Sequence, residues 1–152
     1  MKFQISVVVL LTIATAAGQA VRVCMAVSES DAKTILGASA KRTKDPSGCE
    51  WEAADSRSRR MNVARIAVAS MFERARQDSI KEGVTKDETG LGGAAFSTIP
   101  TSQKGARAAI YMLKDSILLV VDIEGFGPGG AEAHLPQVRD LVRKLGPSVG
   151  KE

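Results

Sequence analysis

Cysteine and histidine are scarce in this sequence, whose 152 residues include two cysteines and one histidine. Many protein metal centres are built from clusters of these side chains, and Cys24, Cys49 and His134 do not show the spacing of metal ligands. The sequence therefore predicts neither a metal site nor a bound cofactor. A Cys-x-x-Cys redox centre is also excluded, because the two cysteines are 25 positions apart.

Aromatic residues and an excess of charge of one sign are scarce as well. Phe, Trp and Tyr make up 4% of the chain, and its formal net charge at neutral pH is +4. Nucleic-acid-binding domains need a strongly basic surface, and those that bind single strands add aromatic side chains on which bases stack. We therefore expect no nucleic-acid partner.

Long hydrophobic runs are absent after the first twenty residues. Residues 1–20 combine one early positive charge, an apolar run and the small residues Gly18 and Ala20, which is typical of a secretory signal peptide. The alternative, a membrane-spanning helix, needs about 20 apolar residues. We expect cleavage before Val21, one mature domain at residues 21–152, a periplasmic or extracellular location, and no stable insertion into a membrane.

An even number of cysteines in an exported chain predicts one intramolecular disulfide, between Cys24 and Cys49. The bridge would close a loop of about 25 residues and stabilise the fold by roughly 3.5 kcal/mol in the chain-entropy estimate. A lipid anchor on Cys24 is the alternative, although Arg22 and Val23 stand where a lipoprotein signal has small residues.

Three segments have the period of amphipathic helices. The first begins after Ser28, a good N-cap residue, and stops at Gly37; the second precedes Gly83, and the third precedes Gly146. Their expected inward-facing residues are Ala32, Ile35 and Leu36 in the first, Met71, Phe72, Ala75 and Ile80 in the second, and Leu135, Val138, Leu141, Val142 and Leu145 in the third.

Strands are expected on both sides of a Pro-Gly turn at Asp45–Gly48, at residues 59–70, and in the three segments 94–100, 107–115 and 116–125. After the turn, Cys49, Trp51 and Ala53 alternate with Glu50 and Glu52, as in a half-buried antiparallel sheet. Residues 84–93 are expected to be a polar, glycine-rich connection. This order predicts an α+β fold, a largely antiparallel sheet with amphipathic helices packed on it.

The densest basic stretch, residues 57–65, is interpreted as a sheet edge protected by its charges. Contact with an acidic partner or with lipid headgroups is the alternative.

Four motifs together resemble a large family of small secreted or lipid-anchored bacterial domains of unknown function. They are "VCMAVSESDAKTILGA", "GCEWEA", "GLGGAAF" and the hairpin "AAIYMLKDSILLVVDIEG". The resemblance implies a PsbP/Mog1-like fold, with Cys24 and Cys49 matching the family's disulfide pair, and it brings no established activity. This chain differs from the pattern in lacking a lipoprotein signal before Cys24 and in having Gly93 where the loop often has Asp.

Few residues are candidates for chemistry, and we expect no catalytic residues. His134 is expected to cap a helix or lie on the surface, and Asp122 and Glu124 share one strand face, as a strand emerging into solvent would also place them. Two glycine-rich loops are the candidate binding surface, because backbone N–H groups in such loops can hold anions. Their residues are Gly90, Leu91, Gly92, Gly93, Phe126 and Gly127.

The function that these observations favour is that of an exported, non-enzymatic domain that binds an envelope protein or a small ligand. The alternative from another class is a secreted inhibitor of another enzyme, built on a small disulfide-bonded sheet. An uncharacterised enzyme is the third reading. A deep apolar cavity would favour a small ligand, whereas a flat exposed surface would favour a protein.

Overall fold

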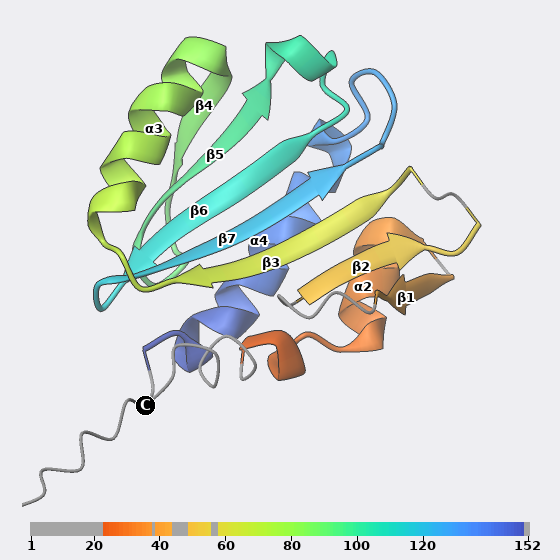
Figure 1. Cartoon of the computed structure of the whole chain (residues 1–152), viewed down its shortest axis with the longest axis horizontal. Helices are drawn as coiled ribbons and strands as arrows, with labels where there is room; N and C mark the ends of the chain where they lie inside the picture. The colour runs from red at the N-terminus through yellow and green to blue at the C-terminus, as the bar shows by residue number, and fades with distance from the viewer. Residues whose placement is uncertain (1–22, 38, 44–48, 56–57, 151–152) are drawn as a thin grey trace, which may run out of the picture.

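The protein is an α+β domain in which a seven-stranded antiparallel sheet carries helices on both faces (Figure 1). This computed structural model describes residues 23–37, 39–43, 49–55 and 58–150. The predicted fold class is therefore confirmed, while the finer PsbP/Mog1 likeness stays a prediction. The expected signal peptide and the turn at Asp45–Gly48 lie outside the described residues.

The strands lie in the order β1-β2-β3-β7-β6-β5-β4, and every neighbouring pair is antiparallel. The elements are β1 (Ala40–Arg42), β2 (Cys49–Ala53), β3 (Arg60–Ile66), β4 (Gly83–Glu88), β5 (Ala94–Pro100), β6 (Ala108–Lys114), β7 (Ile117–Glu124), α2 (Glu29–Leu36), α3 (Ser70–Glu82) and α4 (Leu135–Leu145). The predicted hairpin is β6–β7. Its two turn residues, Asp115 and Ser116, have φ of 49° and 64°, as a tight hairpin turn with the right twist requires.

Alternating side chains give the sheet two different faces. The front face, toward the viewer in Figure 1, carries α3 over β4, β5 and β6, while α4 and α2 lie behind the sheet on the rear face. In the central hairpin, Ile110 and Met112 pair with Val121 and Leu119, and all four are buried on the rear face.

The rear face is sealed by the stripe predicted for the last helix. All five of its expected apolar residues are buried, each at most 5% exposed, and they are Leu135, Val138, Leu141, Val142 and Leu145. Pro136 stands in the first turn, and the helix ends at Gly146, as expected. Burying such a stripe against a sheet is the main source of stability for a helix of this length.

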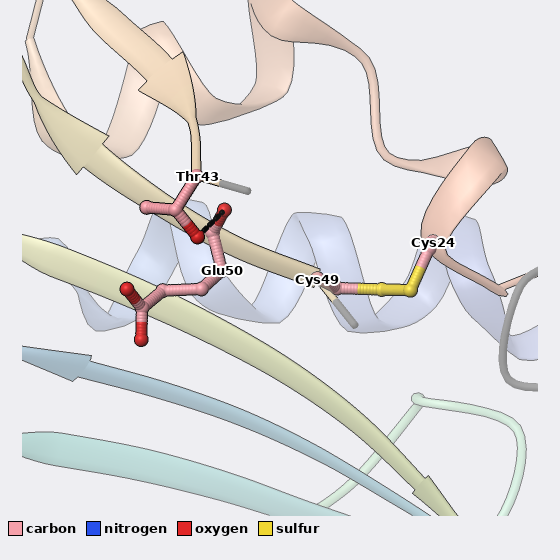
Figure 2. The surroundings of a disulfide bond; sticks show 4 residues. All are labelled: Cys24, Thr43, Cys49 and Glu50. Carbon is pink, nitrogen blue, oxygen red and sulfur yellow. Dashed lines mark hydrogen bonds between the residues drawn. A yellow bond between two sulfur atoms is a disulfide. The ribbon is translucent and has the colours of Figure 1, made fainter. Parts of the chain in front are cut away.

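The N-terminal part completes the seal. Ser28 caps α2 in a capping box with Asp31, and Asp31 also accepts a hydrogen bond from Lys144 of α4 at 2.5 Å. The Cys24–Cys49 disulfide ties the segment before α2 to β2 (Figure 2). The disulfide prediction is therefore confirmed. In this bridge, Cys24 has no sulfur free to carry a lipid. Trp51 is 6% exposed and lies on the same inward face as Cys49.

Three expectations are wrong. Of the expected connection at residues 84–93, residues 84–88 belong to the edge strand β4, which has one strand neighbour and is largely exposed, and only the rest connects β4 to β5. The basic stretch is not an edge, because β3 pairs with both β2 and β7. In α3, Met71 and Ile80 were expected to face inward, but they are 43% and 51% exposed. Phe72 and Ala75 are half-buried, and the buried residue of this helix is Ser79.

We predict that the Cys24→Ala/Cys49→Ala double variant loses about 3.5 kcal/mol of unfolding free energy, because the unfolded chain is no longer constrained by a loop of about 25 residues. Alanine avoids the unpaired hydroxyl that a buried serine would add. Urea unfolding followed by circular dichroism measures the loss. An unchanged unfolding midpoint would show that the bridge does not stabilise the domain.

We predict that Trp51→Ala costs about 3–5 kcal/mol, because it removes a large buried side chain from the rear core. Met25→Ala is the matched control, since Met25 is 74% exposed and its truncation should change little. The same urea experiment measures both variants. A loss below about 1 kcal/mol for Trp51→Ala would mean that the core closes around the gap.

Candidate functional site: an open polar sheet face

The front face is covered on one side only. Helix α3 packs on β4, β5 and β6, and the adjoining part over β7, β3, β2 and β1 is left without a helix in Figure 1. We call this part the open face. Its side chains are at least partly exposed, and they are Lys41, Glu50, Glu52, Arg60, Asn62, Ala64, Val120, Asp122 and Glu124.

The strand register arranges the charged residues of the open face in two rows. In one row, Glu52 pairs with Arg60 and Arg60 with Glu124. Side chains at paired positions lie within reach of each other, so this row places a cation between two carboxylates. The second row has Glu50 paired with Asn62 and Asn62 with Asp122, so an amide takes the central position.

The strongest ion pair of the front face joins Arg107, which immediately precedes β6, to Asp122. Nε of Arg107 donates to both carboxylate oxygens at 3.0 Å, and Nη2 donates to Oδ2. The hydrogen bonds to Asp122 raise the pKa of Arg107, against the effect of burial. The Asp122 side chain is 19% exposed, so the pair is a fixed part of the site rather than a mobile surface contact.

Two small cavities lie on either side of this ion pair. The acidic cavity, about 110 Å³, is lined by Glu50, Arg60, Asn62, Asp122 and Glu124. The hydroxyl cavity, about 70 Å³, lies under the C-terminal end of α3 and is lined by Ser79, Glu82, Thr98, Pro100, Arg107, Ala109 and Tyr111. Arg107 therefore contributes to one cavity and its partner Asp122 to the other.

The hydroxyl cavity contains two groups in unusual environments. Thr98 is 5% exposed, and its buried hydroxyl has no hydrogen-bond partner among the described residues. Tyr111 stacks on Phe96, with ring centroids 4.7 Å apart. Burial raises the pKa of Tyr111, and the charges of Asp122 and Glu82 raise it further, whereas Arg107 lowers it. Its phenol group is therefore neutral at physiological pH.

Larger depressions occur on the rear side, but they are shallow. One of about 200 Å³ lies between β4, β5 and the start of α4, and another of similar volume lies between α2 and α4. The first is bordered by Arg139, which donates to Glu88 at 2.6 and 2.8 Å and holds the pKa of that carboxyl below its usual range. Both volumes are below the roughly 300–1,000 Å³ typical of small-molecule sites.

The structure places the two predicted glycine loops at opposite ends of the sheet. Residues Gly90–Gly93 join β4 to β5, and Nε of Arg143, near the end of α4, donates to the Gly90 carbonyl at 3.3 Å. Phe126 and Gly127 follow β7 and precede α4, so the loops do not form one surface. A Cβ at Gly93 would lie 2.2 Å from the Leu113 carbonyl oxygen, so a larger residue at this position would require the backbone to shift.

His134 lies at the N-cap position of α4 but makes no capping hydrogen bond with its side chain. Its ring packs on Phe126, with centroids 4.4 Å apart, and burial together with the charge of Arg59 lowers its pKa. Nδ1 is buried and has no hydrogen-bond partner within the described part of the chain. Of the two expected roles, capping or a surface position, capping is therefore wrong, and the half-buried imidazole packs against Phe126.

Asp122 and Glu124 do lie on one face, as the sequence indicated, but their partners were missed. Arg107 stands one residue before its strand, and Glu50 and Asn62 join Asp122 only through the register of three strands. In the sequence, the only signal was the alternation of Glu50 and Glu52 with buried neighbours. Among the described residues, no group of three His, Cys, Asp or Glu side chains is arranged to hold a metal ion.

Comparisons with protein-family models, with curated proteins and with solved structures found no match for this chain. Within the described ranges, no helix has the length and apolar character needed to cross a membrane. Function must therefore be argued from the open face itself.

We predict that the pKa of Tyr111, the only tyrosine, lies above the ordinary value of about 10 and falls when Asp122 is replaced by Asn. The substitution removes a negative charge and frees the Arg107 cation, and both changes favour the phenolate. Ultraviolet absorbance during a pH titration measures the shift, with Glu52→Gln as the control on the same face. An unchanged Tyr111 pKa in Asp122→Asn would contradict this coupling.

The raised pKa of Tyr111 also makes the stability of the fold depend on pH. Because folded Tyr111 keeps its proton to higher pH than the unfolded chain does, its contribution to stability is complete below about pH 10 and is lost as the pH rises through the folded pKa.

Proposed function

We propose that this protein is an exported, non-enzymatic domain that binds another protein through its open face. One observation carries the proposal: the rear face of the sheet is sealed by α2 and α4, whereas the front face is only half covered. The open part is a flat array of charged and amide side chains held on paired strands. Small-molecule sites are typically concave and mostly apolar, so a polar surface of this kind suits a protein partner better.

Export is part of the proposal. The first twenty residues have the pattern of a signal peptide, and the Cys24–Cys49 disulfide is compatible with an oxidising compartment. The partner would therefore be a protein of the envelope or the extracellular space.

A small ligand is the less favoured occupant. The apolar core between the sheet and α4 is filled by buried side chains, and the cavities described above hold at most about 200 Å³. Catalysis is also less favoured, because Asp122 is engaged by Arg107 and the ring of His134 packs against Phe126. The open face thus offers recognition groups rather than a poised acid–base pair.

We predict that a photoreactive p-benzoylphenylalanine at position 62 forms a covalent adduct with a partner protein in an extract of the producing cells. Asn62 is exposed at the centre of the open face, so the probe replaces no core contact. The matched control carries the same probe at Asp140, whose side chain on α4 is 75% exposed. Gel shift and mass spectrometry identify the adducts. Finding no adduct, or the same adducts from both positions, would contradict the proposal.

A further inference from the structure

We infer that the open face binds a basic segment of its partner, with an arginine or lysine side chain of that segment entering the acidic cavity. This inference rests on the proposed function, because it names the chemistry of the partner that the open face binds. It follows from the charges on the face, from the missing cation in one of its rows, and from the unpartnered acceptors in the cavity.

The open face is acidic, although the protein as a whole is basic. Its four carboxylates are accompanied by the cationic side chains of Lys41 and Arg60, and the Arg107 cation next to the face compensates one of the four. Among the described residues, an excess of one negative charge therefore remains on this surface, in a chain whose formal net charge is +4. Such a surface is complementary to a positively charged segment.

The two rows show where the cation belongs. In the row through Arg60, the guanidinium stands between Glu52 and Glu124 and lies 3.8 Å from Glu124. In the row through Asn62, the same central position has no charge, and a cation there would lie between the Glu50 carboxylate and the Asp122 carboxylate, which Arg107 already binds. The partner's side chain would supply that cation from above the sheet.

The acceptors around this position are not used within the described part of the protein. The Glu50 carboxylate makes no ion pair or hydrogen bond with a described residue, and neither does the Asn62 amide. Arginine donates five N–H groups from a planar fork and so suits an array of separate oxygen acceptors. Ala64 and Val120 pair one position further along the same face and would contact the aliphatic part of the side chain.

The neighbouring hydroxyl cavity contains another polar group without a partner. It is lined by Thr98, whose nine-tenths-buried hydroxyl has no partner among the described residues, and by the Glu82 carboxylate. A buried hydroxyl without a hydrogen bond is costly. This cavity lies under α3, across the Arg107–Asp122 ion pair from the acidic cavity, so it is separate from the position proposed for the cation.

The first test uses a defined probe, acetylated hexa-arginine amide, with acetylated hexa-citrulline amide as its uncharged isostere. NMR amide shifts on the disulfide-bonded protein should change around Glu50, Asn62 and Asp122 with the arginine peptide and not with the citrulline peptide. The Glu50→Gln/Glu124→Gln variant should bind about tenfold or more weakly, since hydrogen bonds to charged groups are lost. The control variant Glu29→Gln/Asp140→Asn removes two exposed carboxylates elsewhere and should bind as before.

A second variant tests whether the arginine peptide binds because position 62 has no cation. Asn62→Arg places a cation on the sheet itself, so it should raise the melting temperature and abolish binding of the arginine peptide. The control variant Asn62→Gln should leave the melting temperature and the binding nearly unchanged. Binding of the arginine peptide that is equal in Asn62→Arg, or its absence in the wild-type protein, would overturn the inference.

The adduct formed from position 62 separates this inference from the proposed function. Mapping the crosslinked peptide should find Lys or Arg next to the attachment point, and the Glu50→Gln/Glu124→Gln changes should lower its yield. A specific adduct to an acidic or neutral segment, or to a second copy of this chain, would overturn the basic-segment inference while leaving binding at the open face intact. Absence of any adduct would overturn both.

Discussion

The packing of the α4 stripe against the rear face of β6 and β7 is the contact on which the rest of the structure depends. Val138 and Val142 are completely buried in the same core cluster as Ile110 and Val121, which lie on the central strands β6 and β7. Helix α2 then needs only to cover the remaining part of this face, where Lys144, Asp31 and the disulfide fix it. Because one side of the sheet supplies most of the core, the other side is free to be polar.

The elements that were predictable are those whose own periodicity decides them. The five-residue stripe of α4 and the alternation of Cys49 and Trp51 with Glu50 are local patterns, and both specify a buried face. Strand β4 has no such pattern. It is a strand because β5 offers it a partner, and pairing of this kind is invisible in a polar segment taken alone. Helix α3 buries Ser79 instead of Ile80 because polar groups line the sheet beneath its C-terminal end.

The site was less predictable than the fold, because it is assembled from distant parts of the sequence. Glu50 and Asp122 share a row only because β3 lies between β2 and β7 in one particular register. A shift of one residue in that register would turn Asn62 to the rear face and break the row. Likewise, Arg107 lies outside its strand, and nothing local indicates that it turns toward Asp122. Sequence patterns therefore identified which residues point outward but not which of them meet.

The open face also contains a residue that makes the fold less stable than an alternative side chain would. Asn62 stands between Glu50 and Asp122 at a position where Lys or Arg would add a favourable charge interaction, as Arg60 does with Glu124 in the adjacent row. Close by, Thr98 keeps a buried hydroxyl without a partner in the described structure. Features that weaken a fold without an internal compensation are concentrated at functional sites in proteins. The uncharged position at Asn62 therefore lies on the part of the sheet that is left for a partner.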